Sequence, residues 1–357
     1  MADIFDQFTN LTLNNEEARS DADLIKVNPY LTPEVQAIHG VQTGVMMDKY
    51  IPILGQIEDI GLVDPGTCGV NTLTDAIPVS QKTWTPKIIS HRIPICKDDI
   101  NVKFKAWMEA QIASKRWEEI NDDLKQYVLD KTQEAVTRGI IRIAEFGDTA
   151  AALASAGGHF TAGSTVALFS MLDGMWKQIF TDAALGASAK IKRYTIAENT
   201  EATKANQLNL AADKAIAAFE YMITEIAPEA SSGNLVIQCT KSLWDNYRQS
   251  VISKGGAYNT GLITRGMTDK EYGGYPIIVR NDWDRIIRKY YDDGTAYWLP
   301  HRAILTDINN IPVGTSDTES FSNLDAFYDK VTKKFYIDVA WREDCKILQE
   351  ENMAVAY

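Results

Sequence analysis

Residues 311–357 read IPVGTSDTESFSNLDAFYDKVTKKFYIDVAWREDCKILQEENMAVAY, and this stretch decides the fold. Two β-rich runs flank the turn sequence DKVTKK, which predicts a tight antiparallel hairpin over 327–338. The apolar run at 353–357 predicts a further strand, because a loose terminus is usually polar. We expect this last strand to lie in a sheet beside the hairpin, and no residue of the stretch has the character of a catalytic group.

The residues before this stretch alternate between helix and strand patterns. Helices are expected at 169–184, 206–226, 242–253 and 281–290, and strands at 235–237, 275–279, 297–299 and 303–305. The alternation predicts a mixed α/β domain around one central sheet. An Ala/Gly-rich linker at 147–165 precedes this domain and marks a domain boundary.

Residues 98–146 predict one long helix before the linker. The segment begins with Asp98 and Asp99, has apolar residues at steps of three and four, and contains no proline. A helix of this length would span roughly 65–70 Å. A coiled coil is the rival interpretation, but the apolar pattern does not keep a heptad repeat.

Residues 61–97 predict a hairpin that projects from the body, because prolines in its extended segments favour sheet edges. Its second limb carries Lys82, Lys87 and Arg92, and no acidic residue lies between Ala76 and Lys97. A solvated strand face explains these charges as well as a contact with an acidic neighbour does. The residues before about 45 are mixed and polar and predict an extended arm.

Composition limits the function classes. The chain has 357 residues, is 45% hydrophobic and 24% charged, and predicts two or three globular domains. Its net charge of -12 argues against a dedicated nucleic-acid binder, which needs clustered Lys and Arg. No apolar run is long enough to span a membrane. The acidic first residues are unlike a secretory signal, so we expect the protein to act in a cytoplasm.

Motifs that carry chemistry are absent from the sequence. There is no phosphate-binding GxxxxGK[ST] loop, no GxGxxG, no HExxH and no GxSxG. The four cysteines and four histidines are scattered, without the spacing of a zinc or redox site. Asp292 and Asp293 precede a glycine and predict a turn rather than a cation site. We therefore expect no enzyme activity, no cofactor and no metal.

The order of these parts resembles the major capsid proteins of tailed double-stranded-DNA phages, which have the Johnson fold first described in the Hong Kong phage. The sharpest local likeness is NIPVGT at 310–315, followed by TKKFYID at 332–338 and VAY at 355–357. This pattern resembles the C-terminal block of capsid proteins from phages of gut Bacteroidetes. The resemblance implies an α+β, Johnson-type capsid fold and a structural protein that is not an enzyme.

The resemblance also implies a division into named parts. They are an N-terminal arm at 1–54, an extended E-loop hairpin at 55–97, a peripheral domain with a long spine helix at 98–164 and 315–357, and a mixed α/β axial domain at 165–314. The basic limb would then lie over an acidic spine or arm of an adjacent subunit. The residues expected in contacts between subunits are Lys82, Trp84, Lys87, Arg92, Asp122 and Asp123.

The implied partners are further copies of the chain, in hexamers and pentamers of an icosahedral shell, with a portal and decoration proteins. A separate scaffolding protein is expected, because no large charged segment precedes the arm. No covalent crosslink is expected, because the lysine and asparagine of the type member have no match here. The shell would form in the bacterial cytoplasm, without a membrane, and enclose double-stranded DNA without sequence-specific binding. An encapsulin-type nanocompartment shell of the same fold is the alternative, and an α/β enzyme is a more distant one.

Overall fold

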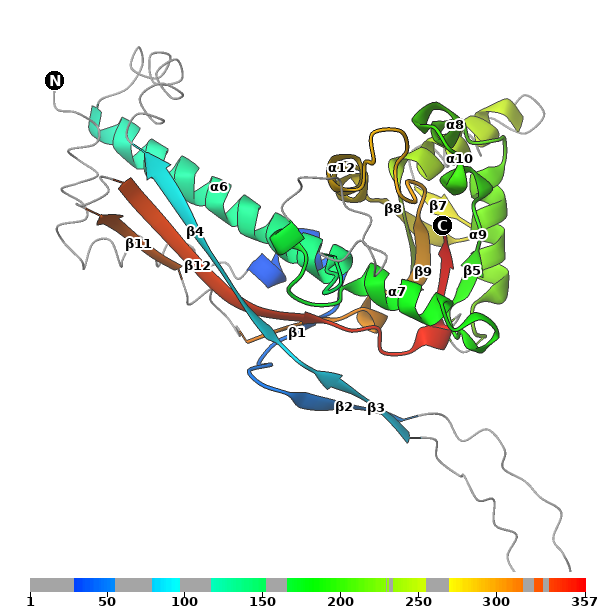
Figure 1. Cartoon of the computed structure of the whole chain (residues 1–357), viewed down its shortest axis with the longest axis horizontal. Coiled ribbons are helices and arrows are strands. Elements are labelled where there is room, and N and C mark those ends of the chain that lie inside the picture. Colours follow the sequence, from blue (N-terminus) through cyan, green and yellow to red (C-terminus); the bar gives the residue numbers. More distant parts are fainter. Residues whose placement is uncertain are drawn as a thin grey trace, which may run out of the picture.

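The computed structural model describes residues 29–54, 79–96, 117–151, 166–228, 230, 234–254, 270–316, 324–329 and 334–357. These residues form two lobes that meet near the middle of the molecule (Figure 1). An elongated lobe holds a long helix against a five-stranded sheet, and a compact lobe holds a six-stranded sheet with helices around it. The predicted α+β class is confirmed.

The elongated lobe is built on α6 (Trp117–Phe146) and a sheet whose central strand is the longest in the described chain. The strands are β1 (Val41–Gln42), β10 (Val313–Thr315), β11 (Leu324–Asp329), β12 (Lys334–Cys345) and β4 (Lys87–Cys96). β12 pairs antiparallel with β4 along one side and with β10 and β11 along the other, and β1 adds to β10 in parallel. The predicted terminal hairpin is therefore confirmed as β11 and β12.

Alternation along β12 explains why this sheet packs on the helix. Ile337, Val339 and Trp341 are buried, and they share one face of the sheet because side chains alternate along a strand. They belong to one apolar cluster with Val136 and Ile140 of α6. The long helix is confirmed from residue 117 onward, and residues 98–116 lie outside the described part of the chain.

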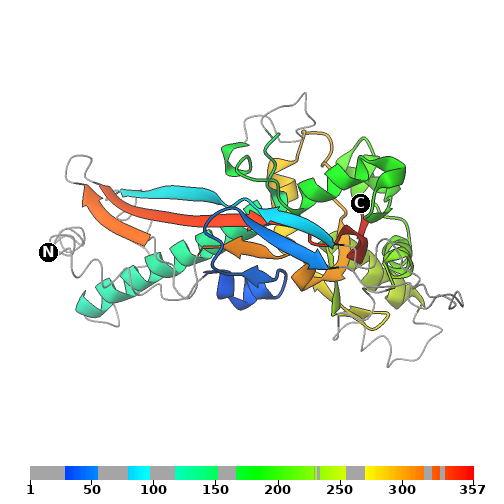
Figure 2. The same cartoon turned by 90° about the horizontal axis from the view of Figure 1, so that it is seen from below.

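A two-stranded hairpin leaves the body beside β1 and points away from both lobes (Figure 1). It consists of β2 (Lys49–Leu54) and β3 (Val79–Trp84), paired antiparallel from Lys49 opposite Trp84 to Leu54 opposite Val79. Figure 2 shows the chain passing from β3 into β4, which returns along β12. The projecting hairpin is thus confirmed, although its outgoing limb begins at residue 49, inside the segment expected to be the arm. Pro52 and Pro94 lie in β2 and β4, each of which pairs with one strand in the described chain.

The compact lobe has a mixed six-stranded sheet. In spatial order its strands are β5 (Lys192–Tyr194), β13 (Met353–Ala356), β9 (Ala303–Asp307), β6 (Leu235–Cys239), β8 (Tyr275–Val279) and β7 (Glu271–Tyr272). β13 runs parallel to β5, β6 runs parallel to β8, and β9 is antiparallel to both of its neighbours. All residues of β6 and β13 are buried, as expected for strands covered on both faces.

Helices cover the two faces of this sheet and create two apolar cores. The helices are α7 (Met175–Ala183), α8 (Lys204–Leu208), α9 (Lys214–Glu225), α10 (Lys241–Lys254) and α12 (Asn281–Tyr290). On one face Ile304 and Val355 pack with α7, α12 and the end of α6, so this core continues into the elongated lobe. On the other face Leu305 and Ala354 pack with α9 and α10. The shared core makes the two lobes one folded unit.

Short helical turns connect these elements. They are η1 (Pro29–Leu31), α3 (Pro33–Gln36), η3 (Val166–Leu168), η4 (Gly186–Ser188), η5 (Ala197–Thr200), η7 (Ile308–Asn310) and η8 (Glu350–Asn352). Tyr30 and Val35 of the first two turns are fully buried. The first described residues of the expected arm, 29–35, are therefore packed against the body. Within the described residues no helix is both long and apolar enough to cross a bilayer.

The position of the last strand corrects the sequence-based expectation. β13 lies between β5 and β9 in the compact lobe, whereas it was expected beside the terminal hairpin in the peripheral sheet. The reason lies in the residues between β12 and β13, where η8 turns the chain away from the five-stranded sheet. The four strand residues are apolar on both faces, which suits a central position in a covered sheet.

Three smaller expectations within 165–314 also need correction. The helix expected at 169–184 begins only at residue 175, after Gly174 in extended conformation. The helix expected at 206–226 is two helices, α8 and α9, separated by residues 209–213, where Asp213 before α9 adopts the left-handed conformation. Residues 297–299 form only an isolated bridge from Tyr297 to Asp292. Asp292 and Asp293 accept hydrogen bonds from the backbone N–H groups of residues 294–296, which confirms the predicted turn.

Candidate functional site

The described residues offer little that could perform chemistry. They contain no group of three or more His, Cys, Asp or Glu side chains placed to hold a metal ion. The candidate sites considered below are a surface and a joint. They are the base of the projecting hairpin and a buried polar joint between the lobes.

At the hairpin base, two of the basic residues predicted to contact a neighbour have partners in their own chain. Lys82 forms an ion pair with Glu350 of η8. Arg92 donates two hydrogen bonds of 2.6 Å to Asp338, which lies directly opposite on β12. Both pairs are partly exposed, so each contributes about 0–1 kcal/mol to stability. Lys87 is exposed and makes no ion pair within the described residues.

Trp84 fixes the base of the hairpin to the five-stranded sheet. It is 3% exposed, and its ring lies flat against the backbone of Gly314 in β10. A Cβ atom at position 314 would lie 2.9 Å from two carbons of this ring, which is too close for any side chain. The glycine is therefore needed for close packing at this point. Trp84 is a buried anchor within the chain, and the side chains of the predicted contact residues Asp122 and Asp123 lie outside the described part of α6.

Large apolar side chains are exposed around the same base. Met46, Met47, Tyr50 and Ile88 have exposed fractions of 60%, 74%, 67% and 68%. Arg342 links two of them, because it lies opposite Ile88 in the sheet and donates a hydrogen bond to the carbonyl oxygen of Met46. Exposed apolar groups that gather in one region commonly mark an interaction surface.

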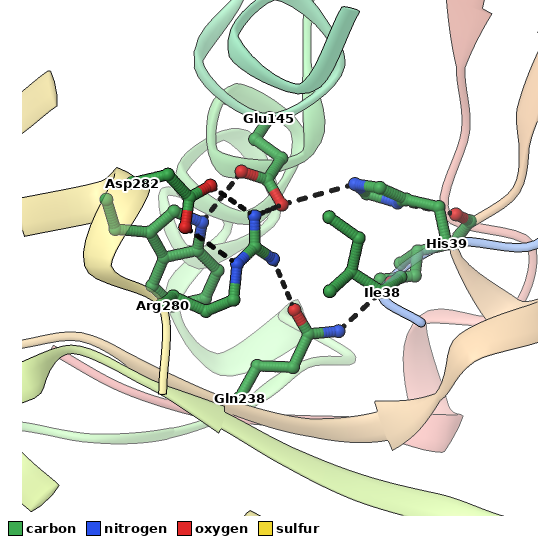
Figure 3. A network of polar contacts seen from close by, with 8 residues as sticks. Ile38, His39, Glu145, Gln238, Arg280 and Asp282 are labelled. Atoms are coloured by element: carbon green, nitrogen blue, oxygen red, sulfur yellow. Dashed lines mark hydrogen bonds and ion pairs between the residues drawn. The ribbon is translucent and has the colours of Figure 1, made fainter. Parts of the chain in front are cut away.

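The second site is a buried network around Glu145, close to the C-terminal end of α6 (Figure 3). Glu145 accepts hydrogen bonds from Arg280 at 2.5 Å and from the indole N–H of Trp283 at 2.7 Å. Arg280 also donates to Asp282 at 3.0 and 2.6 Å and to the side-chain oxygen of Gln238 at 2.5 Å. The network thus ties the long helix of one lobe to β6 and α12 of the other.

The segment after α3 enters this joint as well. Gln238 donates to the carbonyl oxygen of Ile38 at 3.1 Å. His39 places Nε2 3.2 Å from a carboxylate oxygen of Glu145 and Nδ1 3.0 Å from the carbonyl oxygen of Ile311. Both neighbours are acceptors, so both bonds form only when both ring nitrogens carry protons. The segment after α3 is thereby bound to the same carboxylate that Arg280 contacts.

Electrostatic interactions in the joint favour the charged forms of Arg280 and Asp282. Burial alone would lower the pKa of Arg280, but the carboxylates of Glu145 and Asp282 outweigh it and raise this pKa above its usual value. Burial would raise the pKa of Asp282, and the charge and hydrogen bonds of Arg280 lower it below its usual range instead. The joint is a set of compensated charges that holds three segments in one arrangement.

Comparisons with known proteins identify the architecture. No protein-family model and no curated protein sequence matches the chain. A chain in the structure of the satellite phage P4 procapsid including size determination (Sid) protein superposes with a TM-score of 0.57 and 12% identity, over 95% of this chain and 89% of that one. A chain of Mycobacterium phage Ogopogo gives 0.54 and 12%, over 90% of both chains. A chain of the capsid of Myoviridae phage XM1 gives 0.52 and 9%, over 92% of both.

This chain has the capsid fold. The predicted Johnson-type architecture is thereby confirmed at the level of the fold, since identities near 10% reach no further.

The sequence predicted the basic limb of this capsid fold but missed the joint. Glu145 comes near the end of the long helix, and in the sequence it looks like an ordinary polar residue at that position. His39, Gln238 and Arg280 are far from it and from one another in sequence, so no spacing links them. The apolar surface at the hairpin base was missed as well, although the pair Met46–Met47 in a polar segment could have indicated it.

Proposed function

We propose that this chain is a structural protein that self-assembles, as hexamers and pentamers, into the icosahedral shell of a tailed double-stranded-DNA phage. The observation that carries the proposal is the likeness in fold to chains of phage particles, which extends over about nine-tenths of each chain. A likeness of that extent involves the arrangement of both lobes and the hairpin. The link to phages of gut Bacteroidetes remains a prediction from the sequence pattern at 310–357.

Within the proposed shell, each part of the chain has an expected place. The hairpin of β2 and β3 would be the E-loop, α6 the spine helix of a peripheral domain, and the compact lobe the axial domain near the capsomer axis. The C-terminal segment of the peripheral domain would then end with β12, because β13 belongs to the compact lobe. Residues 255–266, expected nearest the axis, lie outside the described residues.

The proposal includes partners and a location. The shell would enclose double-stranded DNA as part of the virion and assemble in the cytoplasm of the host bacterium. It would work with a separate scaffolding protein, a portal and decoration proteins. The procapsid and the capsid compared above are both phage particles, and this supports a phage shell over an encapsulin-type nanocompartment.

Electron microscopy of the purified full-length chain is the direct test. We expect closed icosahedral particles, or capsomers that form them when a scaffolding protein is supplied. Particles that hold a protein cargo and no DNA when isolated from their natural source would support the encapsulin alternative. A chain that stays monomeric under all these conditions would contradict both. Denaturing electrophoresis of the particles should show monomer bands only, since no crosslink is expected.

The predicted contact residues Lys82 and Arg92 need a test that separates contacts within a chain from contacts between chains. Lys82→Glu with Arg92→Glu should leave the subunit folded and block shell assembly. A matched variant exchanges each pair, Lys82→Glu with Glu350→Lys and Arg92→Asp with Asp338→Arg, and so keeps both ion pairs within the chain. If the basic limb contacts a neighbour, the exchanged variant also fails to assemble. Normal shells from the exchanged variant would show that these residues act only within the subunit.

A further inference from the structure

A basic surface lies on α12, beside the C-terminal half of α6 and away from β11 and β12 (Figure 1). Arg285, Arg288 and Lys289 are exposed at helical positions three and four apart, so they share one side of α12. Within the described chain none of the three forms an ion pair. The exposed side of this helix is therefore positive, in a chain whose net charge is -12.

Arg142 of α6 extends this surface. Burial lowers its pKa, nearby Tyr290 and Glu343 counter this effect, and the positive charge of nearby Arg285 lowers the pKa further. Its Nε atom is buried and has no hydrogen-bond partner among the described residues. Two like charges close together favour an anion beside them, because the anion reduces their repulsion.

Aromatic rings hold two of these cations in place. Phe169 and Tyr290 form an edge-to-face pair with ring centres 4.9 Å apart. The guanidinium of Arg142 lies 5.7 Å from the ring centre of Phe169, and the ammonium of Lys289 lies 5.0 Å from that of Tyr290. Such contacts orient the cations without neutralising them.

The nearest carboxyl groups do not cancel the charge. Burial raises the pKa of Glu343 to about 8, so near neutral pH this group beside Arg142 is mostly protonated. Burial raises the pKa of Asp284, on α12 itself, more than the hydrogen bond of 2.8 Å from the backbone N–H of Lys241 and the charge of Arg288 lower it. One carboxyl group therefore lies near Arg288, and the exposed cations together keep a net positive charge that suits an anion.

We propose that the surface formed by Arg142, Arg285, Arg288 and Lys289 contacts the phosphate backbone of double-stranded DNA and therefore faces the interior of the shell. This inference rests on the proposed function. The planar guanidinium groups suit phosphate oxygens, and an exposed helix side with separated cations suits the regular spacing of a duplex backbone. With so few cations on an acidic protein the contact would be weak, sequence-independent and sensitive to salt.

The test measures binding of a fluorescent duplex DNA of mixed sequence to the purified full-length chain at several salt concentrations. Arg285→Glu with Arg288→Glu should weaken binding at low salt about tenfold or more, and should reduce the slope of log affinity against log salt by about 2. The matched control is Lys192→Glu with Lys270→Glu, which makes the same change of net charge at two exposed lysines without ion pairs in the described chain. The control should lose much less affinity and keep the slope.

Other outcomes overturn the proposal. Equal losses in the two variants would show an effect of net charge alone, and unchanged binding in the first variant would exclude the surface. Arg285→Gln with Arg288→Gln, which removes charge without reversing it, should show a smaller loss and guards against misfolding. Electron microscopy of the same samples keeps the two proposals apart. A reversed variant that binds DNA normally but forms no shells would assign the surface to a protein contact, whereas a wild-type chain that forms no shells would contradict only the proposed function.

Discussion

The joint around Glu145 and the base of the projecting hairpin use their side chains in opposite ways. In the joint Glu145 and Arg280 are buried, and Arg280 alone reaches Glu145, Asp282 and Gln238. At the hairpin base large apolar groups such as Met47 are left in water. The difference indicates that the joint holds the subunit together and that the hairpin base is available for contacts with other molecules. Substitutions in the two regions should therefore separate stability from assembly.

The largest effect on stability should come from the joint. Glu145→Ala leaves the buried Arg280 without one of its two carboxylates and removes the partner of His39 Nε2 and of the indole N–H of Trp283. We expect the free energy of unfolding to fall by about 3–5 kcal/mol, as in other buried pairs that lose one partner. Glu145→Gln keeps an acceptor of similar shape and should cost less. Denaturant unfolding of both variants measures the difference, and a cost below about 1 kcal/mol for Glu145→Ala would show that the joint is not what holds the lobes.

The buried carboxyl group of Glu343 should make the free energy of unfolding depend on pH. Burial raises its pKa from 4.5 to about 8, so between these values the folded state holds a proton that the unfolded state has lost. The contribution of Glu343 to stability therefore falls as pH rises through this window, by at most about 1.4 kcal/mol per pH unit. Glu343→Gln removes this dependence and should gain stability relative to the wild type from pH 5 to pH 8. A difference in the free energy of unfolding between the two proteins that stays constant from pH 5 to pH 8 would contradict a protonated Glu343.

A smaller effect is expected where the hairpin meets the sheet. Gly314→Ala would place a methyl group 2.9 Å from ring carbons of Trp84, and overpacking of this kind costs about 1–3 kcal/mol. Gly139→Ala on α6 is the matched control, because its methyl group would lie at an ordinary 3.7 Å from Trp341. The control should stabilise the helix by about 0.4–1 kcal/mol. A change of the melting temperature in the same direction for both variants would refute the packing argument.

The smallest effect on stability, and the largest on assembly, should come from the exposed apolar surface. Met47→Ser with Ile88→Thr should change the free energy of unfolding by no more than about 0.5 kcal/mol each, because both side chains are exposed. The same variant should form few or no shells. Leu208→Ser with Ile252→Thr serves as control, since these two large apolar side chains are also exposed but lie on the compact lobe. Equal shell yields from the two variants, measured by sedimentation and electron microscopy, would remove the hairpin base from the proposed contacts.

The sequence predicted helices, strands and turns correctly where the local pattern and the tertiary contacts favour the same structure. The terminal hairpin, the helix through Phe146, the strands β6, β8 and β9 and the turn at Asp292 were all predicted from period and turn chemistry. The patterns failed where a partner far along the chain decides the outcome. The four apolar residues of β13 predict a buried strand, but which sheet receives them depends on β5 and β9, and no local signal identifies those partners.

The candidate sites show even more strongly that contacts between distant segments cannot be predicted from local sequence. Lys82 and Arg92 were recognisable as a basic cluster, but their partners Glu350 and Asp338 lie about 250 residues away on segments that only the fold brings near. A buried charge such as Glu145 looks like a surface charge in sequence, because its environment is created by α12 and by the segment after α3. Residue type therefore indicated positions for contacts, and the fold decided which of these contacts form within the chain.

The central place of β13 has a consequence for how the protein is made. β5 leaves the ribosome about 160 residues before its neighbour β13, a delay of roughly 8–32 s at bacterial rates of synthesis. Until residues 353–356 emerge, β5 and the inner edge of β9 have no partner, so the compact lobe cannot close its sheet during translation. A subunit would therefore complete the sheet of its compact lobe only after residues 353–356 are made, and chains terminated before them would be excluded from the proposed shell.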